Sequence, residues 1–173
     1  MKIIFETERL LLREFNISDA EKMYQLNSDP DVIRFTGDAP FESVEIAARF
    51  LKNYSDYKRN GFGRWVCIEK SSEEFIGWCG LKKHSHEIVD IGYRFFKKDW
   101  GKGFATESAK ASLAYGFNNL NLREIIGRSD AANIASIKVL EKLNMHFWKK
   151  ESVDGIENAM VYRINKNQFL NSQ

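Results

Sequence analysis

The chain is poor in proline, cysteine and histidine: its 173 residues include two prolines, two cysteines and three histidines. With so little proline and no linker-like stretch, nothing divides the chain, so we expect one domain over residues 1–173. Two cysteines cannot form a disulfide framework, and the spacing of Cys67 and Cys79 matches neither a redox pair nor a zinc site. Both lie in apolar runs, which predicts buried thiols and no bound metal.

An excess of charge of one sign is also missing, because 26 Lys and Arg residues oppose 24 Asp and Glu residues, leaving a net charge of +2. So small a charge does not favour a polyanion as the main partner. The apolar residues 1–5 are followed by Glu6 and Glu8 before a signal-peptide core or a membrane span could form. We therefore expect no nucleic-acid partner, no membrane partner and a cytoplasmic location.

Hydrophobic periodicity predicts an α+β fold with a mixed, largely antiparallel sheet of six to seven strands and about four helices. Ser18 and Glu21 match a capping box for a first helix that runs to about Leu26. Helical spacing returns in residues 46–57, and Gly61 ends that run. The expected strands are 9–14, 64–69, 75–81, 88–96, 124–128 and two near Phe147 and Val161, with further helices over 105–117 and 134–143.

A glycine-rich turn joins the strand that ends near Phe96 to the following helix. Glycines at 101 and 103 let the backbone approach an anion, and the first N–H groups of a helix point towards such an anion. Lys97, Lys98 and Lys102 could face its phosphates. The turn lacks the Gly-Lys-Ser/Thr of a P-loop. Gly101 and Gly103 with Glu124 fit a dinucleotide site somewhat better, but three non-alternating strands precede the turn, which is the wrong context.

Three ordered segments, 90–95 (DIGYRF), 100–107 (WGKGFATE) and 133–143 (NIASIKVLEKL), together resemble the GNAT superfamily. Residues 6–13 and 28–32 extend the likeness, which within that superfamily is to the RimJ/RimL-type acetyltransferases. The family's cofactor loop has Gln or Arg, two residues, Gly, one residue, then Gly or Ala. Gly103 and Ala105 fill the last two positions here, and Trp100 departs from the first.

The resemblance implies a GNAT-type acyl-CoA N-acyltransferase fold with splayed central strands, and acetyl-CoA as cosubstrate. It also implies that the strand before the turn pairs with the pantetheine arm, that Asn133 contacts this arm, and that Ser136 lies beside the thioester sulfur. The cofactor-binding residues it implies are Tyr93, Arg94, Phe95, Trp100, Gly101, Lys102, Gly103, Phe104, Ala105, Thr106, Asn133 and Ser136. Asn133 and Ser136 equally fit a plain helix-capping role.

The expected reaction is direct acetyl transfer to a primary amine, which needs a proton acceptor, an oxyanion donor and a proton for sulfur. Ser136 is the candidate proton donor. Asp90 is the candidate base, because many GNAT enzymes carry a Glu there, and Glu87, His84 and His86 are alternatives. An α-amine has a pKa of about 7.7 to 8.0 against about 10.4 for a lysine amine, so an N-terminal acceptor would need little help from a base.

The acceptor stays open at this level. An N-terminal α-amine of the ribosomal-protein type is one candidate. A small amine such as a polyamine or aminoglycoside is another, and a non-catalytic acyl-CoA-binding domain is a third reading. Four aromatic residues could line the acceptor pocket or belong to the core, namely Phe35, Phe41, Trp65 and Trp78. We expect a monomer or a homodimer.

Overall fold

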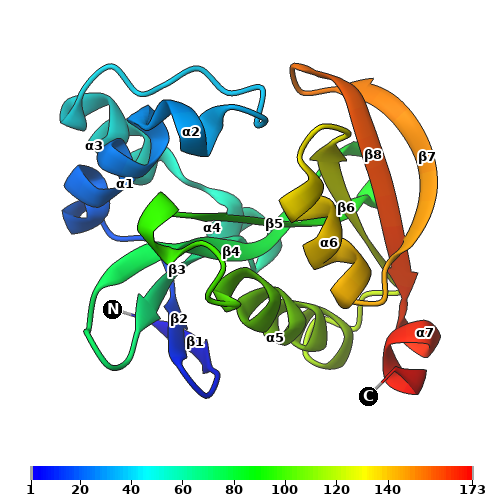
Figure 1. Ribbon diagram of the computed structural model, residues 1–173. Helices are drawn as coiled ribbons and strands as arrows, with labels where there is room; N and C mark the ends of the chain where they lie inside the picture. Colours follow the sequence, from blue (N-terminus) through cyan, green and yellow to red (C-terminus); the bar gives the residue numbers. More distant parts are fainter. Residues whose placement is uncertain (1, 173) are drawn as a thin grey trace.

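The computed structural model describes residues 2–172, and one eight-stranded sheet runs through it in the order β1-β2-β3-β4-β5-β6-β8-β7 (Figure 1). Neighbouring strands are antiparallel except β5 and β6, which are parallel. The mixed, largely antiparallel sheet that the sequence predicts is therefore confirmed. The strands are β1 (Ile3–Glu6), β2 (Leu10–Arg13), β3 (Arg64–Glu69), β4 (Phe75–Lys83), β5 (Val89–Phe95), β6 (Glu124–Asp130), β7 (His146–Val153) and β8 (Ile156–Asn165).

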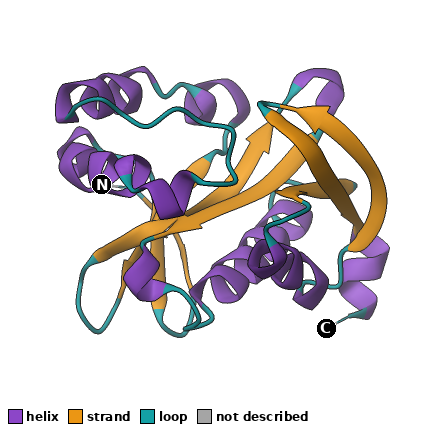
Figure 2. Cartoon of the chain, turned by 45° about the horizontal axis from the view of Figure 1, so that its top comes forward, coloured by secondary structure: helices purple, strands orange, loops and turns teal. Residues whose placement is uncertain are grey.

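Helices cover both faces of the sheet (Figure 2). The α-helices within residues 2–172 are α1 (Ala20–Ser28), α2 (Pro30–Ile33), α3 (Val44–Asn53), α4 (Asp56–Asn60), α5 (Phe104–Asn118), α6 (Ile134–Lys142) and α7 (Lys166–Asn171). Short 3-10 turns occupy Ile17–Asp19, Ser85–Glu87 and Lys97–Asp99.

Two separate cores hold these layers together. The larger core joins β2 to β6 with α5 and α6, and Trp65, Leu113 and Phe117 are among its members. The smaller core packs α1 and α3 against the opposite face, where Val66 and Phe75 contribute. Burying apolar surface on both faces is what lets the central strands be almost uniformly apolar.

Both cysteines are free and buried, as the sequence predicts. Cys67 and Cys79 are fully covered, and burial raises the pKa of both thiols. A thiol whose pKa is raised in this way is a poor nucleophile at neutral pH.

The first helix begins differently from the prediction. The capping box is formed by Asn16 and Asp19 rather than by Ser18 and Glu21. Asp19 also accepts two hydrogen bonds from Arg13 of β2, at 2.7 and 2.6 Å, in a buried ion pair. This bidentate pair ties the start of the helical layer to the sheet, which a purely local capping pattern does not reveal.

The helix predicted over residues 46–57 is in fact two helices, α3 and α4, separated at Tyr54 and Ser55. The Tyr54 hydroxyl accepts the backbone N–H of Arg64 at 2.7 Å, and the Tyr57 hydroxyl donates to the Arg64 carbonyl. The hydroxyls of both tyrosines thus bind the backbone at the start of β3. The sequence also missed the edge strand β1, so the sheet has eight strands rather than six to seven.

Candidate active site

The two central strands part immediately after they pair. Only Asp90 with Ile126 and Ile91 with Gly127 are in register between β5 and β6. Beyond these pairs, β5 continues beside β4 while β6 continues beside β8. The splay of the central strands is therefore confirmed, and it leaves edge N–H and C=O groups of both strands facing a gap, where an extended amide-bearing chain can add as a strand.

The glycine-rich turn leads from β5 into α5. Gly101 and Gly103 have φ of 75° and 85°, a left-handed backbone that glycine adopts without steric cost. Gly103 is the N-cap of α5 and supplies no side-chain cap. The first N–H groups of α5, from Phe104 to Thr106, consequently have no acceptor within the helix and form a place suited to an anion.

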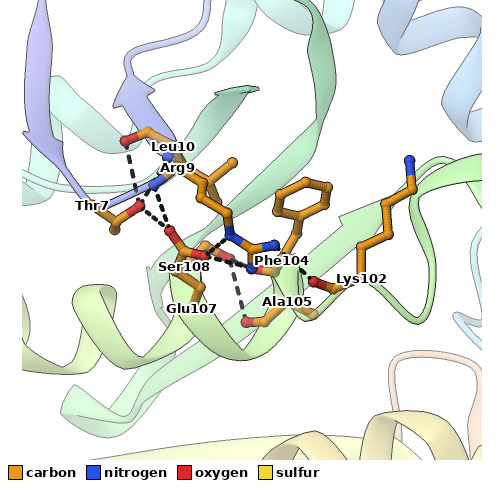
Figure 3. Close-up of polar contacts among 8 residues, drawn as sticks. All are labelled: Thr7, Arg9, Leu10, Lys102, Phe104, Ala105, Glu107 and Ser108. Carbon is orange, nitrogen blue, oxygen red and sulfur yellow. Dashed lines mark hydrogen bonds and ion pairs between the residues drawn. The ribbon is translucent and has the colours of Figure 1, made fainter. Parts of the chain in front are cut away.

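A clamp of hydrogen bonds, formed by Thr7, Arg9 and Glu107, holds this turn in place (Figure 3). The Glu107 carboxylate accepts hydrogen bonds from the Thr7 hydroxyl at 2.6 Å and from Arg9 Nε at 2.7 Å. Arg9 in turn donates to the Lys102 carbonyl at 3.0 Å and lies 4.5 Å from the centre of the Phe104 ring. Burial by itself would raise the pKa of Glu107, but its contacts with Thr7 and Arg9 lower it. The β1–β2 connection therefore fixes the shape of the turn.

The three lysines near the turn are each paired with a carboxylate. Lys97 pairs with Asp31 at 2.5 Å and Lys98 with Glu74 at 2.6 Å. Lys102 pairs with Asp99 at 2.8 Å. The ammonium groups are thus engaged with the protein, and the anion-binding character of the turn rests on its backbone N–H groups.

Two aromatic residues of the turn point in opposite directions. Trp100 is 48% exposed, and its indole N–H donates to the Phe95 carbonyl at 2.8 Å. Phe104 is buried beneath Arg9. Of these two predicted cofactor residues, only Trp100 presents a side chain to the surface, and Phe104 can contribute its backbone N–H.

Across the gap, α6 brings Ser136 against β5. The Tyr93 hydroxyl lies 3.1 Å from Ser136 Oγ and donates to the Ser136 carbonyl at 3.0 Å. The Asn133 side chain accepts the Ser136 backbone N–H at 3.2 Å, which caps α6. Burial raises the pKa of Tyr93, so its hydroxyl keeps its proton at neutral pH. Residues 93, 133 and 136, which the sequence predicts as site members, are therefore close together.

These groups open into a cleft of about 960 Å³ between the sheet, α3, the loop after α2 and the β7–β8 hairpin. Phe35, Phe41 and Trp78 line it, which is one of the two alternatives that the sequence left open for them. Trp65 does not, because it is buried in the larger core. The cleft also includes residues that sequence reasoning missed: Phe15, Phe50, Tyr54, Arg64, Arg128 and Asp130.

Asp90, the predicted base, sits at the fork of the splay in a buried ion network. Its carboxylate lies 2.5 Å from Arg64 Nη2 and 2.9 Å from His84 Nε2. Burial alone would raise the pKa of Asp90, but Arg64 and His84 lower it to about 2. A carboxylate this acidic is a poor proton acceptor near neutral pH, which argues against Asp90 as the base, and the identity of the base stays a prediction.

Arg94 lines the same cleft, and its guanidinium donates to Asn27 and to Asp38 at 2.6 Å. Cofactor binding through the backbone of Arg94 on β5 stays a prediction. Of the alternative bases, His86 and Glu87 are exposed on the turn before β5 and do not line the cleft, whereas His84 does.

A splayed sheet with a helix N-terminus at its mouth and an adjoining cleft defines an acyltransferase of the acyl-CoA type. The family model described as "Acetyltransferase (GNAT) domain" matches residues 9–146. The chain belongs to the GNAT family of acetyltransferases and is an enzyme, and the use of acetyl-CoA goes with this fold. The reading as a non-catalytic domain is thereby set aside.

Similar proteins of known sequence or structure include other acetyltransferases. The chain is 36% identical to the "Uncharacterized N-acetyltransferase p20" of Bacillus licheniformis over 141 residues, covering 80% of this chain and 79% of the relative. The crystal structure of a GNAT-family acetyltransferase from Bacillus anthracis superposes with a TM-score of 0.81 at 30% identity, covering 96% and 99% of the two chains. This chain is also 27% identical to the spermidine N(1)-acetyltransferase of Escherichia coli K12, and the match covers 76% of this chain and 70% of that protein.

Within residues 2–172, no group of three or more His, Cys, Asp or Glu side chains is arranged to hold a metal ion. In the same part of the chain, no helix combines the length and apolar character needed to cross a membrane.

Proposed function

We propose that this enzyme moves the acetyl group of acetyl-CoA to the primary amine of a small molecule with an apolar or aromatic body. The N–H groups of residues 101–106 would hold the pyrophosphate, and the gap between β5 and β6 would take the pantetheine arm. The thioester would then lie near Ser136 and Tyr93, at the cofactor end of the cleft.

The observation that carries the proposal is a contact that closes over the cleft. A Cβ built on Gly37, in the loop after α2, would lie 2.3 Å from the Asp154 carbonyl at the tip of the β7–β8 hairpin. The backbones of loop and hairpin therefore touch, and residues of both line the cleft. The same approach is visible where the loop after α2 reaches towards the hairpin (Figure 1). A closed-over cleft suits a slender acceptor rather than the surface of a folded protein.

The lining of the cleft supports an apolar or aromatic acceptor. Seven aromatic rings face it: Phe15, Phe35, Phe41, Phe50, Tyr54, Trp78 and Tyr93. Its charges balance, because five Asp side chains stand against four Arg side chains and one Lys side chain. A polyamine carries several positive charges and would be favoured by an excess of carboxylates, which this cleft lacks.

During transfer, Ser136 would give a proton to the departing sulfur and regain one from the acceptor nitrogen, with Tyr93 holding the Ser136 hydroxyl in place. A backbone N–H at the free edge of β5 would stabilise the oxyanion. The likeness to RimJ/RimL-type enzymes favours a protein N-terminus as acceptor instead, and an unfolded N-terminal segment is thin enough to enter. The acceptor assay therefore includes such a peptide.

An acceptor panel tests the proposal. Release of CoA thiol is followed with phenylethylamine, spermidine and a short peptide that has a free N-terminal serine. We expect the highest kcat/KM for the aromatic amine, by about tenfold, since one well-filled apolar subsite is worth roughly 1–3 kcal/mol. A tenfold preference for spermidine or the peptide would instead overturn the proposed acceptor class.

A further inference from the structure

A histidine and a carboxylate form a fixed pair on the floor of the cleft. His84 follows the end of β4, and its Nε2 lies 2.9 Å from Asp90 Oδ2 on β5. The backbone N–H of His84 donates to the Ile88 carbonyl at 2.7 Å, which closes the turn. The imidazole is 20% exposed and lines the cleft. Both the backbone and the ring of His84 are thus held, and the side chain lines the cleft.

Asp90 is itself held in place by Arg64. The Arg64 guanidinium donates to Asp90 Oδ1 at 2.5 Å and to the Asp90 carbonyl at 3.2 Å, and its carbon lies 5.6 Å from the Trp78 ring centre. It lies against β5 at Gly92, where a Cβ would come within 2.6 Å of Arg64 Nη2. The glycine at 92 is therefore what admits the guanidinium that fixes the carboxylate.

The direction of the His84–Asp90 hydrogen bond follows from the charge of the carboxylate. With a pKa of about 2, Asp90 is ionised at neutral pH and can only accept. Nε2 must then carry the proton, which leaves the lone pair of Nδ1 free to accept one. A carboxylate that orients an imidazole in this way is the usual arrangement behind a histidine base.

The pair lies where the central strands separate. Asp90 is in register with Ile126, one residue before the last paired position, and Arg128 Nη1 on β6 is 3.6 Å from Asp90 Oδ2. Tyr93 and Ser136 line the same cleft. We propose that His84 Nδ1 accepts the proton of the acceptor amine, with Asp90 and Arg64 as positioning residues. The proposal rests on acetyl transfer to an amine, as argued above.

The proton balance is complete with the groups at hand. His84 takes one proton from the ammonium of the acceptor and passes it to water. The neutral nitrogen forms the new N–C bond to the acetyl carbon as the C–S bond breaks. The second proton leaves the nitrogen and ends on the CoA sulfur by way of Ser136. The products are the amide, the CoA thiol and one released proton.

Charged groups surround the imidazole on several elements, and they oppose one another. Arg64 on β3 and Arg128 on β6 lie 2.5 and 3.6 Å from the Asp90 carboxylate, and Lys82 on β4 lines the same cleft. Glu87 on the adjoining turn pairs with Lys83 at 2.7 Å, and Glu151 on β7 pairs with Arg128 at 2.8 Å. The pH profile of the reaction therefore reports the whole network.

Substitution of His84 tests the proposal, with His86→Gln as the matched control because His86 is exposed on the same turn and does not line the cleft. For His84→Gln we expect kcat/KM to fall roughly 100-fold or more and the acidic limb of its pH profile to disappear. His86→Gln should keep the native kcat/KM and the native acidic limb. Acetyl-CoA affinity by calorimetry should stay within twofold in each variant, which shows that each is folded. Asp90→Asn should move the limb towards lower pH, whereas a merely structural defect would lower the rate equally at every pH.

A second variant guards against misfolding of the first. His84→Ala leaves a space that free imidazole can occupy, and added imidazole should raise the rate of this variant at least tenfold. The assay uses whichever amine the native enzyme turns over fastest, so an error in the proposed acceptor class changes the substrate and leaves this comparison intact. An unchanged acidic limb in His84→Gln, a rate within threefold of the native enzyme, or no rescue of His84→Ala by imidazole would each overturn the proposal.

Discussion

At the scale of single residues, the hydroxyl pair of Ser136 and Tyr93 has a defined consequence for turnover. If Ser136 supplies the proton for sulfur, Ser136→Ala should lower kcat by roughly 100-fold. Acetyl-CoA affinity should change little, because the phosphates are held elsewhere. Steady-state kinetics with calorimetry checks this. Tyr93→Phe, which removes the hydroxyl that bonds Ser136, should give a smaller loss of the same kind. Native turnover in Ser136→Ala would remove this residue from the mechanism.

Asp90 also makes stability depend on pH. Its pKa falls from 3.8 to about 2 in the folded protein, so its ion pairs stabilise the fold by about 2 kcal/mol above pH ~4. This stabilisation is lost as the pH falls through about 2. Asp90→Asn should therefore unfold at lower denaturant concentration at pH 7, and its deficit relative to the native protein should shrink between pH 4 and 2. Urea titrations at several pH values check this. A deficit that is constant across that range would contradict the assigned pKa.

Local chemistry made part of the site predictable. Ser136 and Asn133 share a capping signature, and glycines at 101 and 103 mark a left-handed turn, so these positions could be read from the sequence. Arg64 and Arg128 could not be assigned a place in the site, and His84 was only one of three alternatives to Asp90 as the base. Arg64 and Arg128 lie on β3 and β6, whose alignment depends on sheet register, and nothing in their local sequence marks them. Asp90 was found, but its ion partners, which decide its pKa, were not.

At the scale of elements, the clamp between the β1–β2 connection and α5 should affect cofactor binding. Glu107→Gln removes the charge that holds Arg9 against the turn, and loosening the turn should weaken acetyl-CoA binding by about 1 kcal/mol, or roughly fivefold. Stability should change little, because Arg9 is half-exposed. The matched control is Glu124→Gln, at the start of β6, whose carboxylate lies 3.9 Å from Arg163 Nη1. Equal acetyl-CoA affinities of Glu107→Gln and Glu124→Gln in calorimetry would contradict a role of the clamp in cofactor binding.

Elements with a strong apolar period were predictable almost to the residue. The strands β3 to β6 and the helices α5 and α6 begin and end within about two residues of the expected bounds. The short edge strand β1 was missed because its four residues, two exposed and two partly buried, carry little periodic signal. The break between α3 and α4 was missed because Tyr54 and Tyr57 continue a helical spacing while their hydroxyls bind β3, a tertiary effect that local pattern cannot show.

At the scale of the whole molecule, the site is an outcome of topology. One parallel pair in an otherwise antiparallel sheet opens the gap, α5 places its N-terminus at the mouth of that gap, and the loop after α2 meets the hairpin over the cleft. Together these parts draw on all three thirds of the chain. The family resemblance of three ordered segments predicted the cofactor, and the turn alone predicted only an anion, whereas the shape and charge balance of the acceptor cleft required the assembled fold. A cytoplasmic location and the oligomeric state stay predictions.

The central claim is that the turn at residues 101–106 holds acetyl-CoA, and calorimetric titration of acetyl-CoA into Gly103→Val tests it most directly. The matched control is Gly61→Val: Gly61 has φ of 79° against 85° for Gly103, so both variants carry the same backbone strain, but Gly61 lies outside the site. We expect binding to weaken more than about tenfold, above 1.4 kcal/mol, in Gly103→Val and to stay within twofold in Gly61→Val. Equal affinities in the two variants would contradict the account.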